Sequence, residues 1–79
     1  MTAKDMFEAL GWYKSDESND EILFFQKKQG SATYDLDFYF EDKTYWSYGY
    51  AHGREINCPL GADEHLAITK QMKELGWIE

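Results

Sequence analysis

The sequence has little of what small domains often use for extra stability. It contains one cysteine, Cys58, so no disulfide can form within the chain, and one proline, Pro59. It also has no apolar run long enough to cross a bilayer and no basic segment followed by an apolar stretch at its start. We therefore expect neither a signal peptide nor a transmembrane helix, and we predict a cytoplasmic location.

Positive charge is also scarce. Eight basic residues stand against fifteen acidic ones, and the net charge is −7. Nucleic acids and anionic membrane surfaces repel such a chain, because binding to both depends largely on lysine and arginine. The composition therefore argues against direct contact with nucleic acid or with a membrane.

Aromatic residues are abundant, at 18% of the 79 residues. A chain of this length forms one core, and we expect residues 1–79 to be a single domain. Such a core rarely supplies more than about 3–5 kcal/mol, and buried aromatic rings are the most area-rich way to build it. Surplus rings could also form a contact between two copies, so both a monomer and a homodimer remain open.

Both ends of the chain have the 3.6-residue period of an amphipathic helix. At the start, Thr2 and Asp5 form an approximate capping box, the apolar stripe is Ala3, Met6, Phe7 and Leu10, and Gly11 ends the helix before Trp12. At the end, Asp63 is the expected cap, the stripe runs from Glu64 to Leu75, and Gly76 with Trp77 ends it.

The middle of the chain has a period of two, which is typical of strands. Strands are predicted at residues 21–28, 32–40 and 44–52, with turns at 29–31 and 41–43, and a short fourth strand at 54–58. The predicted fold class is α+β, a three- to four-stranded antiparallel meander with both helices on one face. We assign to that covered face the residues Tyr34, Leu36, Phe38, Trp46 and Tyr48.

The two ends resemble a known group of proteins. The segments Met6-Phe7-Glu8-Ala9-Leu10-Gly11-Trp12 and Ala67-Ile68-Thr69-Lys70-Gln71-Met72-Lys73-Glu74-Leu75-Gly76-Trp77 are similar to small, uncharacterised proteins encoded by phages and prophages of Gram-positive bacteria. The middle of the chain, rich in Tyr and Asp, departs from that pattern. The resemblance implies an accessory protein of the bacterial cytoplasm, of a kind that often interferes with a host protein, and it carries over no catalytic residue.

Two sets of residues suggest chemistry, and we favour a structural reading for each. Cys58 could pair with His52 or His65 as a nucleophile or as zinc ligands, yet the spacing fits no zinc motif and Cys58 alternates with Ile56 like a packed strand residue. Asp35 and Asp37 share a strand face about 6.6 Å apart, a separation seen in glycosidases. On an open face we expect them to be solvated with ordinary pKa values, and we predict no enzyme, no metal and no cofactor.

The solvated sheet face is the predicted partner-binding surface, made of Asp35, Asp37, Tyr39, Tyr45 and Ser47. Tyrosine is enriched at protein interfaces because it supplies rigid, amphipathic contact area. An ordinary half-exposed sheet, whose rings brace their neighbours, is the alternative reading. A sharper form of the hypothesis is mimicry of nucleic acid by a row of carboxylates: Asp16, Glu17, Asp20, Glu21, Asp35, Asp37, Glu41 and Asp42.

We therefore expect a non-catalytic phage or prophage accessory protein that binds a host protein, with inhibition of a nucleic-acid-binding target as one form of that activity. The alternative is a self-associating structural module without a host target.

Overall fold

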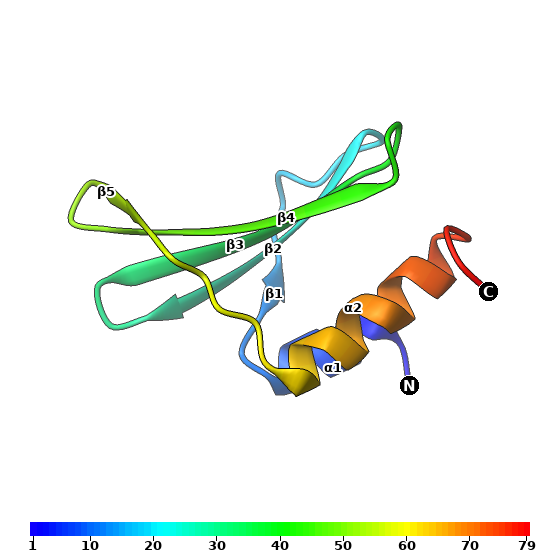
Figure 1. Cartoon of the computed structure of the whole chain (residues 1–79), viewed down its shortest axis with the longest axis horizontal. Helices are drawn as coiled ribbons and strands as arrows, with labels where there is room; N and C mark the ends of the chain where they lie inside the picture. The colour runs from blue at the N-terminus through cyan, green and yellow to red at the C-terminus, as the bar shows by residue number, and fades with distance from the viewer.

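The computed structural model describes residues 1–79 and consists of two helices and one five-stranded antiparallel sheet (Figure 1). The helices are α1 (Ala3–Ala9) and α2 (Ala62–Glu74); the strands are β1 (Tyr13–Lys14), β2 (Ile22–Gln29), β3 (Ala32–Tyr39), β4 (Thr44–Ala51) and β5 (Arg54–Ile56). Their order in the sheet is β1-β2-β3-β4-β5. The predicted α+β meander is confirmed. The structure adds β1, because two residues are too few to show the alternation that predicts a strand.

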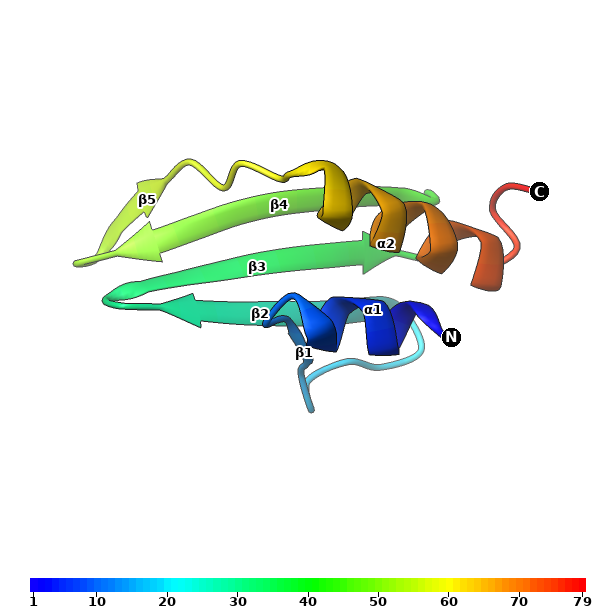
Figure 2. The same ribbon diagram turned by 90° about the horizontal axis from the view of Figure 1, so that it is seen from below.

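Both helices lie on the same side of the sheet, and the opposite side carries no helix (Figures 1 and 2). They run antiparallel, so that the start of α1 meets the end of α2, where the Ala3 amide donates to the Glu74 carboxylate at 2.7 Å. Neither helix has the length and apolar character that a bilayer span requires. Because both helices cover the same side, the other side of the sheet is open to contacts with other molecules.

The predicted helix ends at Gly11 and Gly76 are confirmed in detail. Both glycines have positive φ angles, 90° and 77°, which favour a residue without a Cβ. The Trp12 amide donates to the Phe7 carbonyl and the Trp77 amide to the Met72 carbonyl, each at 2.9 Å. These are the closing bonds of a Schellman motif, and they fold each tryptophan back onto its helix.

The two helix starts differ. At α1 the predicted capping box is present, because Thr2 and Asp5 bond each other's backbone amides. At α2 the predicted cap, Asp63, is wrong. The N-cap is Gly61, and the Glu64 carboxylate accepts a hydrogen bond from its amide at 2.8 Å. Gly61 has no side chain to cap the helix, so the carboxylate that reaches back comes from the third helical residue.

The core lies between the helices and the inner face of β2 and β3. Its centre is three phenylalanines, with Phe7 and Phe25 ring centroids 4.4 Å apart and Phe38 at 6.3 Å from each. Leu36, Ala67 and Ile68 are also buried there. Aromatic burial thus supplies much of the core, as the composition predicted.

The prediction for the faces of β4 is wrong. We expected Trp46 and Tyr48 to face the helices, but Leu36 pairs with Ser47 and Asp37 with Trp46, so Trp46, Tyr48 and Tyr50 lie on the open face. The cause is the length of the turn before β4. Tyr39 pairs with Thr44, leaving a connection of four residues where three were predicted, and a slip of one residue exchanges the two faces of a strand.

Small residues on the covered face of β4 leave room for the side chains around them. A Cβ on Gly49 would lie 2.8 Å from the Tyr34 ring and 3.1 Å from Ile56.

We therefore expect Gly49→Ala to reduce the free energy of unfolding by about 1–2 kcal/mol, because the Tyr34 ring must shift. Urea denaturation measures the loss. In a Tyr34→Ala background the cost should largely disappear, and an equal cost in both backgrounds would refute this explanation.

Candidate functional site

The open side of the sheet brings most of the predicted binding residues together. Strand pairing places Asp35 opposite Tyr48, Asp37 opposite Trp46, and Tyr50 opposite Glu55 on this side. We call this surface the Tyr39 face and define it by Asp35, Asp37, Tyr39, Trp46, Tyr48, Tyr50 and Glu55. Three of the five predicted residues, Asp35, Asp37 and Tyr39, belong to it.

The other two predicted residues, Tyr45 and Ser47, lie on the helix side and are corrections. Tyr45 packs on Phe38 with ring centroids 5.8 Å apart, and the Ser47 hydroxyl donates to the Cys58 carbonyl at 3.5 Å. Their register follows from the four-residue turn described above. Trp46, Tyr48 and Tyr50 take their place on the open side, and the alternation of the strand would have identified them had the turn length been known.

Asp37 is the unusual residue of this face, because its side chain is buried although no helix covers it. Only 1% of the residue is exposed, which contradicts the expectation of a solvated carboxylate. The Tyr39 hydroxyl donates to Oδ2 at 3.3 Å, whereas Oδ1 is buried without a hydrogen-bond partner. One oxygen of the buried Asp37 carboxyl group is therefore hydrogen-bonded, and the other is not, which is unusual for a buried polar side chain.

The electrostatics of Asp37 also differ from the prediction. Burial raises the pKa of its carboxyl group, the nearby Tyr48 hydroxyl opposes that rise, the charge of Asp35 adds to it, and the Tyr39 hydroxyl opposes it. The pKa values of the Tyr48 and Tyr39 hydroxyls are raised as well, first by burial and then by Asp37. Both tyrosines therefore stay protonated and keep a hydroxyl proton available for the carboxylate.

Asp35 behaves more nearly as predicted. It is half-buried, and its Oδ1 accepts a hydrogen bond from the Gln26 amide on the neighbouring strand at 2.8 Å. A paired carboxylate of this kind has little reason to act as a catalytic acid. The two aspartates share a face but have unequal surroundings.

Large aromatic rings are exposed on the same face. Trp46 is 64% exposed and Tyr50 46% exposed, and the rings of Tyr48 and Tyr50 meet edge to face at 5.6 Å. Together with Tyr39 and Glu55 these three residues line a shallow pocket of about 310 Å³. Exposed rings gathered around a hollow are typical of a contact surface.

The predicted row of carboxylates is divided between separate places. Four of them line a second depression beside Tyr39, at the end of the sheet: Asp20, Glu21, Glu41 and Asp42. Asp16 lies elsewhere, around a hollow that also contains Lys4 and Lys14. Tyr39 lines both the acidic depression and the aromatic pocket, and so joins them into one surface.

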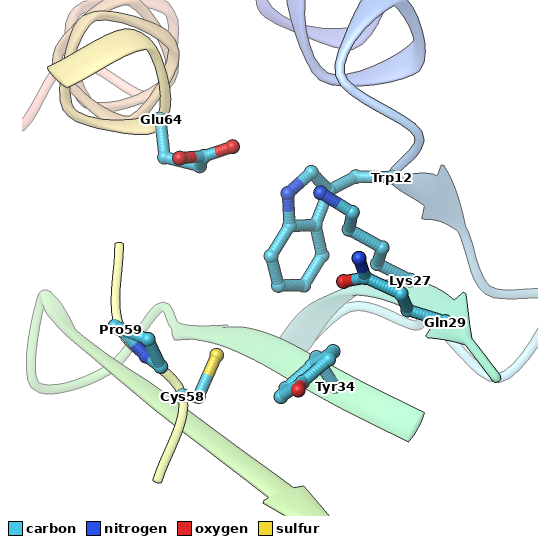
Figure 3. Close-up of a pocket in the computed structure, with 7 residues that line it drawn as sticks. All are labelled: Trp12, Lys27, Gln29, Tyr34, Cys58, Pro59 and Glu64. Atoms are coloured by element: carbon cyan, nitrogen blue, oxygen red, sulfur yellow. The ribbon is translucent and has the colours of Figure 1, made fainter. Parts of the chain in front are cut away.

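A third pocket lies on the helix side, between the start of α2 and strands β2 and β3 (Figure 3). Trp12 and Lys27 face Glu64 across it, and the Lys27 ammonium is 5.9 Å from the Trp12 ring centroid. The Trp12 indole N–H is buried without a partner. At about 110 Å³ the pocket is smaller than the roughly 300 Å³ at which typical ligand sites begin, so we assign it no ligand.

Cys58 lines this small pocket, and no histidine does. Burial raises the pKa of its thiol, which keeps it protonated and unreactive. His52 lies in the turn between β4 and β5, His65 in the first turn of α2, and both are exposed. No group of three or more His, Cys, Asp or Glu side chains in the structure could hold a metal ion.

Comparisons with models of protein families, with curated proteins and with solved structures find no match to this chain. The geometry of the Tyr39 face is therefore the main basis for a functional assignment.

Proposed function

We propose that this chain is a non-catalytic binding protein that attaches to a basic surface of a partner protein through the Tyr39 face. The observation that carries the proposal is the continuity between the pocket of exposed rings and the acidic depression, which Tyr39 joins. Aromatic rings supply contact area, and the carboxylates beside them select a positively charged partner.

The resemblance to phage and prophage proteins suggests that the partner is a host protein of the bacterial cytoplasm. A host protein that binds nucleic acid offers a basic surface of the required kind, and occupying that surface would inhibit it. The four carboxylates grouped at the end of the sheet support this form of the proposal. The remaining acidic residues do not extend that group into a row.

Site-specific photo-cross-linking in bacterial cells tests the proposal. A cross-linking residue at Trp46 should capture a partner, and one at Leu66, which is 58% exposed on α2, should capture none. Reversing two charges beside Tyr39, with Glu41→Lys and Asp42→Lys together, should weaken binding of the captured protein at least about tenfold, because each lost charge pair at such an interface is worth a kcal/mol or more.

Two results would contradict the proposal. Equal capture from Trp46 and Leu66 would show that the Tyr39 face is not selective. A product of twice the mass of the chain, formed only from Trp46, would instead support the self-associating module, in which the exposed rings of two copies cover each other.

A further inference from the structure

The buried carboxyl group of Asp37 has no cation to pair with in its own chain. A buried carboxylate is normally neutralised by a positive partner or by several hydrogen bonds, since desolvation of an unpaired charge is costly. Asp37 is 1% exposed and one of its oxygens is unpartnered. The one ion pair of the structure joins Lys4 to Glu8 on α1, on the other side of the sheet.

The pocket of exposed rings is connected to that carboxyl group. Tyr39 and Tyr48 line the pocket; the Tyr39 hydroxyl donates to Asp37, and the Tyr48 hydroxyl lowers the pKa of the same carboxyl group. Trp46, which also lines the pocket, is the direct cross-strand neighbour of Asp37. The carboxyl group therefore neighbours residues that line the pocket, and its own burial keeps its charge weakly screened by water.

The lining of the pocket favours a cation that is flat and weakly hydrated. The faces of tyrosine and tryptophan rings are electron-rich and attract cations, and Glu55 at the rim adds a full negative charge. A guanidinium group stacks on such rings and loses less hydration than an ammonium group. The acidic depression on the other side of Tyr39 adds four more carboxylates, so the negative charge continues beyond the pocket.

We propose that the pocket formed by Tyr39, Trp46, Tyr48, Tyr50 and Glu55 receives an arginine side chain of the partner protein, with the guanidinium over the rings and Asp37 as its buried counter-charge. This inference rests on the proposed function and specifies which group the partner contributes. Asp37 is a positioning residue here, since it acts through the tyrosine hydroxyls and the ring of Trp46.

The probe is Nα-acetyl-arginine amide, and the matched control is Nα-acetyl-citrulline amide, which has nearly the same shape without the charge. Nuclear magnetic resonance of the indole N–H groups reports binding, because Trp12 and Trp77 lie elsewhere and serve as internal references. Arginine amide should shift the Trp46 signal saturably. Citrulline amide should bind at least about fivefold more weakly, the factor expected when a cation is removed from aromatic rings.

Variants separate the roles of the rings and the carboxyl group. Trp46→Leu should abolish the saturable response in the remaining amide signals of β4, and Asp37→Asn should weaken arginine binding at least about threefold. Tyr13→Ala is the matched control, because Tyr13 is an equally exposed ring beside Lys14 and Lys28 on the opposite edge of the sheet. It should leave arginine binding unchanged.

Equal binding of the arginine and citrulline amides, or arginine binding that survives both Trp46→Leu and Asp37→Asn, would overturn the inference. This failure is distinguishable from failure of the proposed function. If Trp46 captures a partner but the pocket ignores arginine amide, the inference is wrong and the proposed function stands. If the pocket binds arginine amide but Trp46 captures no partner, both the proposed function and the assignment to a protein side chain are wrong.

Discussion

Replacing Phe38 with alanine is expected to unfold most of the protein at room temperature. The residue is 0% exposed, and its ring centroid lies 6.3 Å from those of Phe7 and Phe25 and 6.1 Å from that of Trp77. Removing a buried phenylalanine ring costs about 3–5 kcal/mol, which includes the cavity left behind. A core of this size supplies about as much in total, so little folded protein should remain.

The matched control is Trp46→Ala, which removes a larger ring from the adjacent strand. Because Trp46 is 64% exposed, its loss should change the free energy of unfolding by less than about 0.5 kcal/mol. Urea denaturation followed by circular dichroism measures both variants. If Trp46→Ala lowered the free energy of unfolding more than Phe38→Ala does, Trp46 would have to pack against the helices and not lie on the open face.

The parts of the fold that depend on neighbouring residues could be predicted from the sequence. The capping box at Thr2, the glycine at each helix end and the fold-back of Trp12 and Trp77 are all set within about six residues of chain. The alternation of β3 has the same local character, and it placed Leu36 and Phe38 in the core correctly.

The composition of β4 could not assign its two faces. The strand offers one aromatic face and one small-residue face, and hydrophobicity alone favours the aromatic one for the core. The core is filled instead by Phe7, Phe25 and Phe38, and the chain after β5 packs Cys58 and Leu60 against it. Small residues such as Gly49 fit under that packing, which is a long-range effect absent from the local pattern.

The candidate site was predicted in part for the same reason. Asp35, Asp37 and Tyr39 were found because they share the alternation of one strand, whereas their partners on β4 depended on the register of the next. The burial of Asp37 was missed because aspartate is usually exposed. Its cross-strand neighbours, Phe24 and Trp46, come from the two adjacent strands, and they are known only once the register of those strands is known.

Asp37→Asn is expected to stabilise the folded protein at pH 7 by about 1–3 kcal/mol, because a buried carboxylate without a cationic partner costs more to desolvate than the neutral amide that replaces it. The direction follows from the raised pKa of the carboxyl group. Since the folded state holds the proton more tightly than the unfolded state, stability is greatest below the unfolded pKa, near 3.8, and falls as the pH rises through the folded pKa. Asparagine removes this dependence because it cannot ionise.

The measurement is urea denaturation of both proteins at pH 7 and at pH 3. The variant should be more stable at pH 7, and the difference should shrink towards zero at pH 3, where Asp37 is protonated in both states. Asp16→Asn is the matched control. Asp16 is an exposed carboxylate in a separate hollow of the surface, so this change should alter the free energy of unfolding by less than about 0.5 kcal/mol at either pH.

If the Asp37→Asn variant gains stability and loses binding, binding explains why the protein keeps a destabilising carboxylate at a position where asparagine would fit. The same Asp37→Asn protein should therefore bind arginine amide more weakly, although it resists urea better. The two effects have opposite signs, and a generally damaged fold would lower both. A variant that is less stable at pH 7 would show that hydrogen bonds within the protein already stabilise the carboxylate, and Asp37 would then be no counter-charge awaiting a cation.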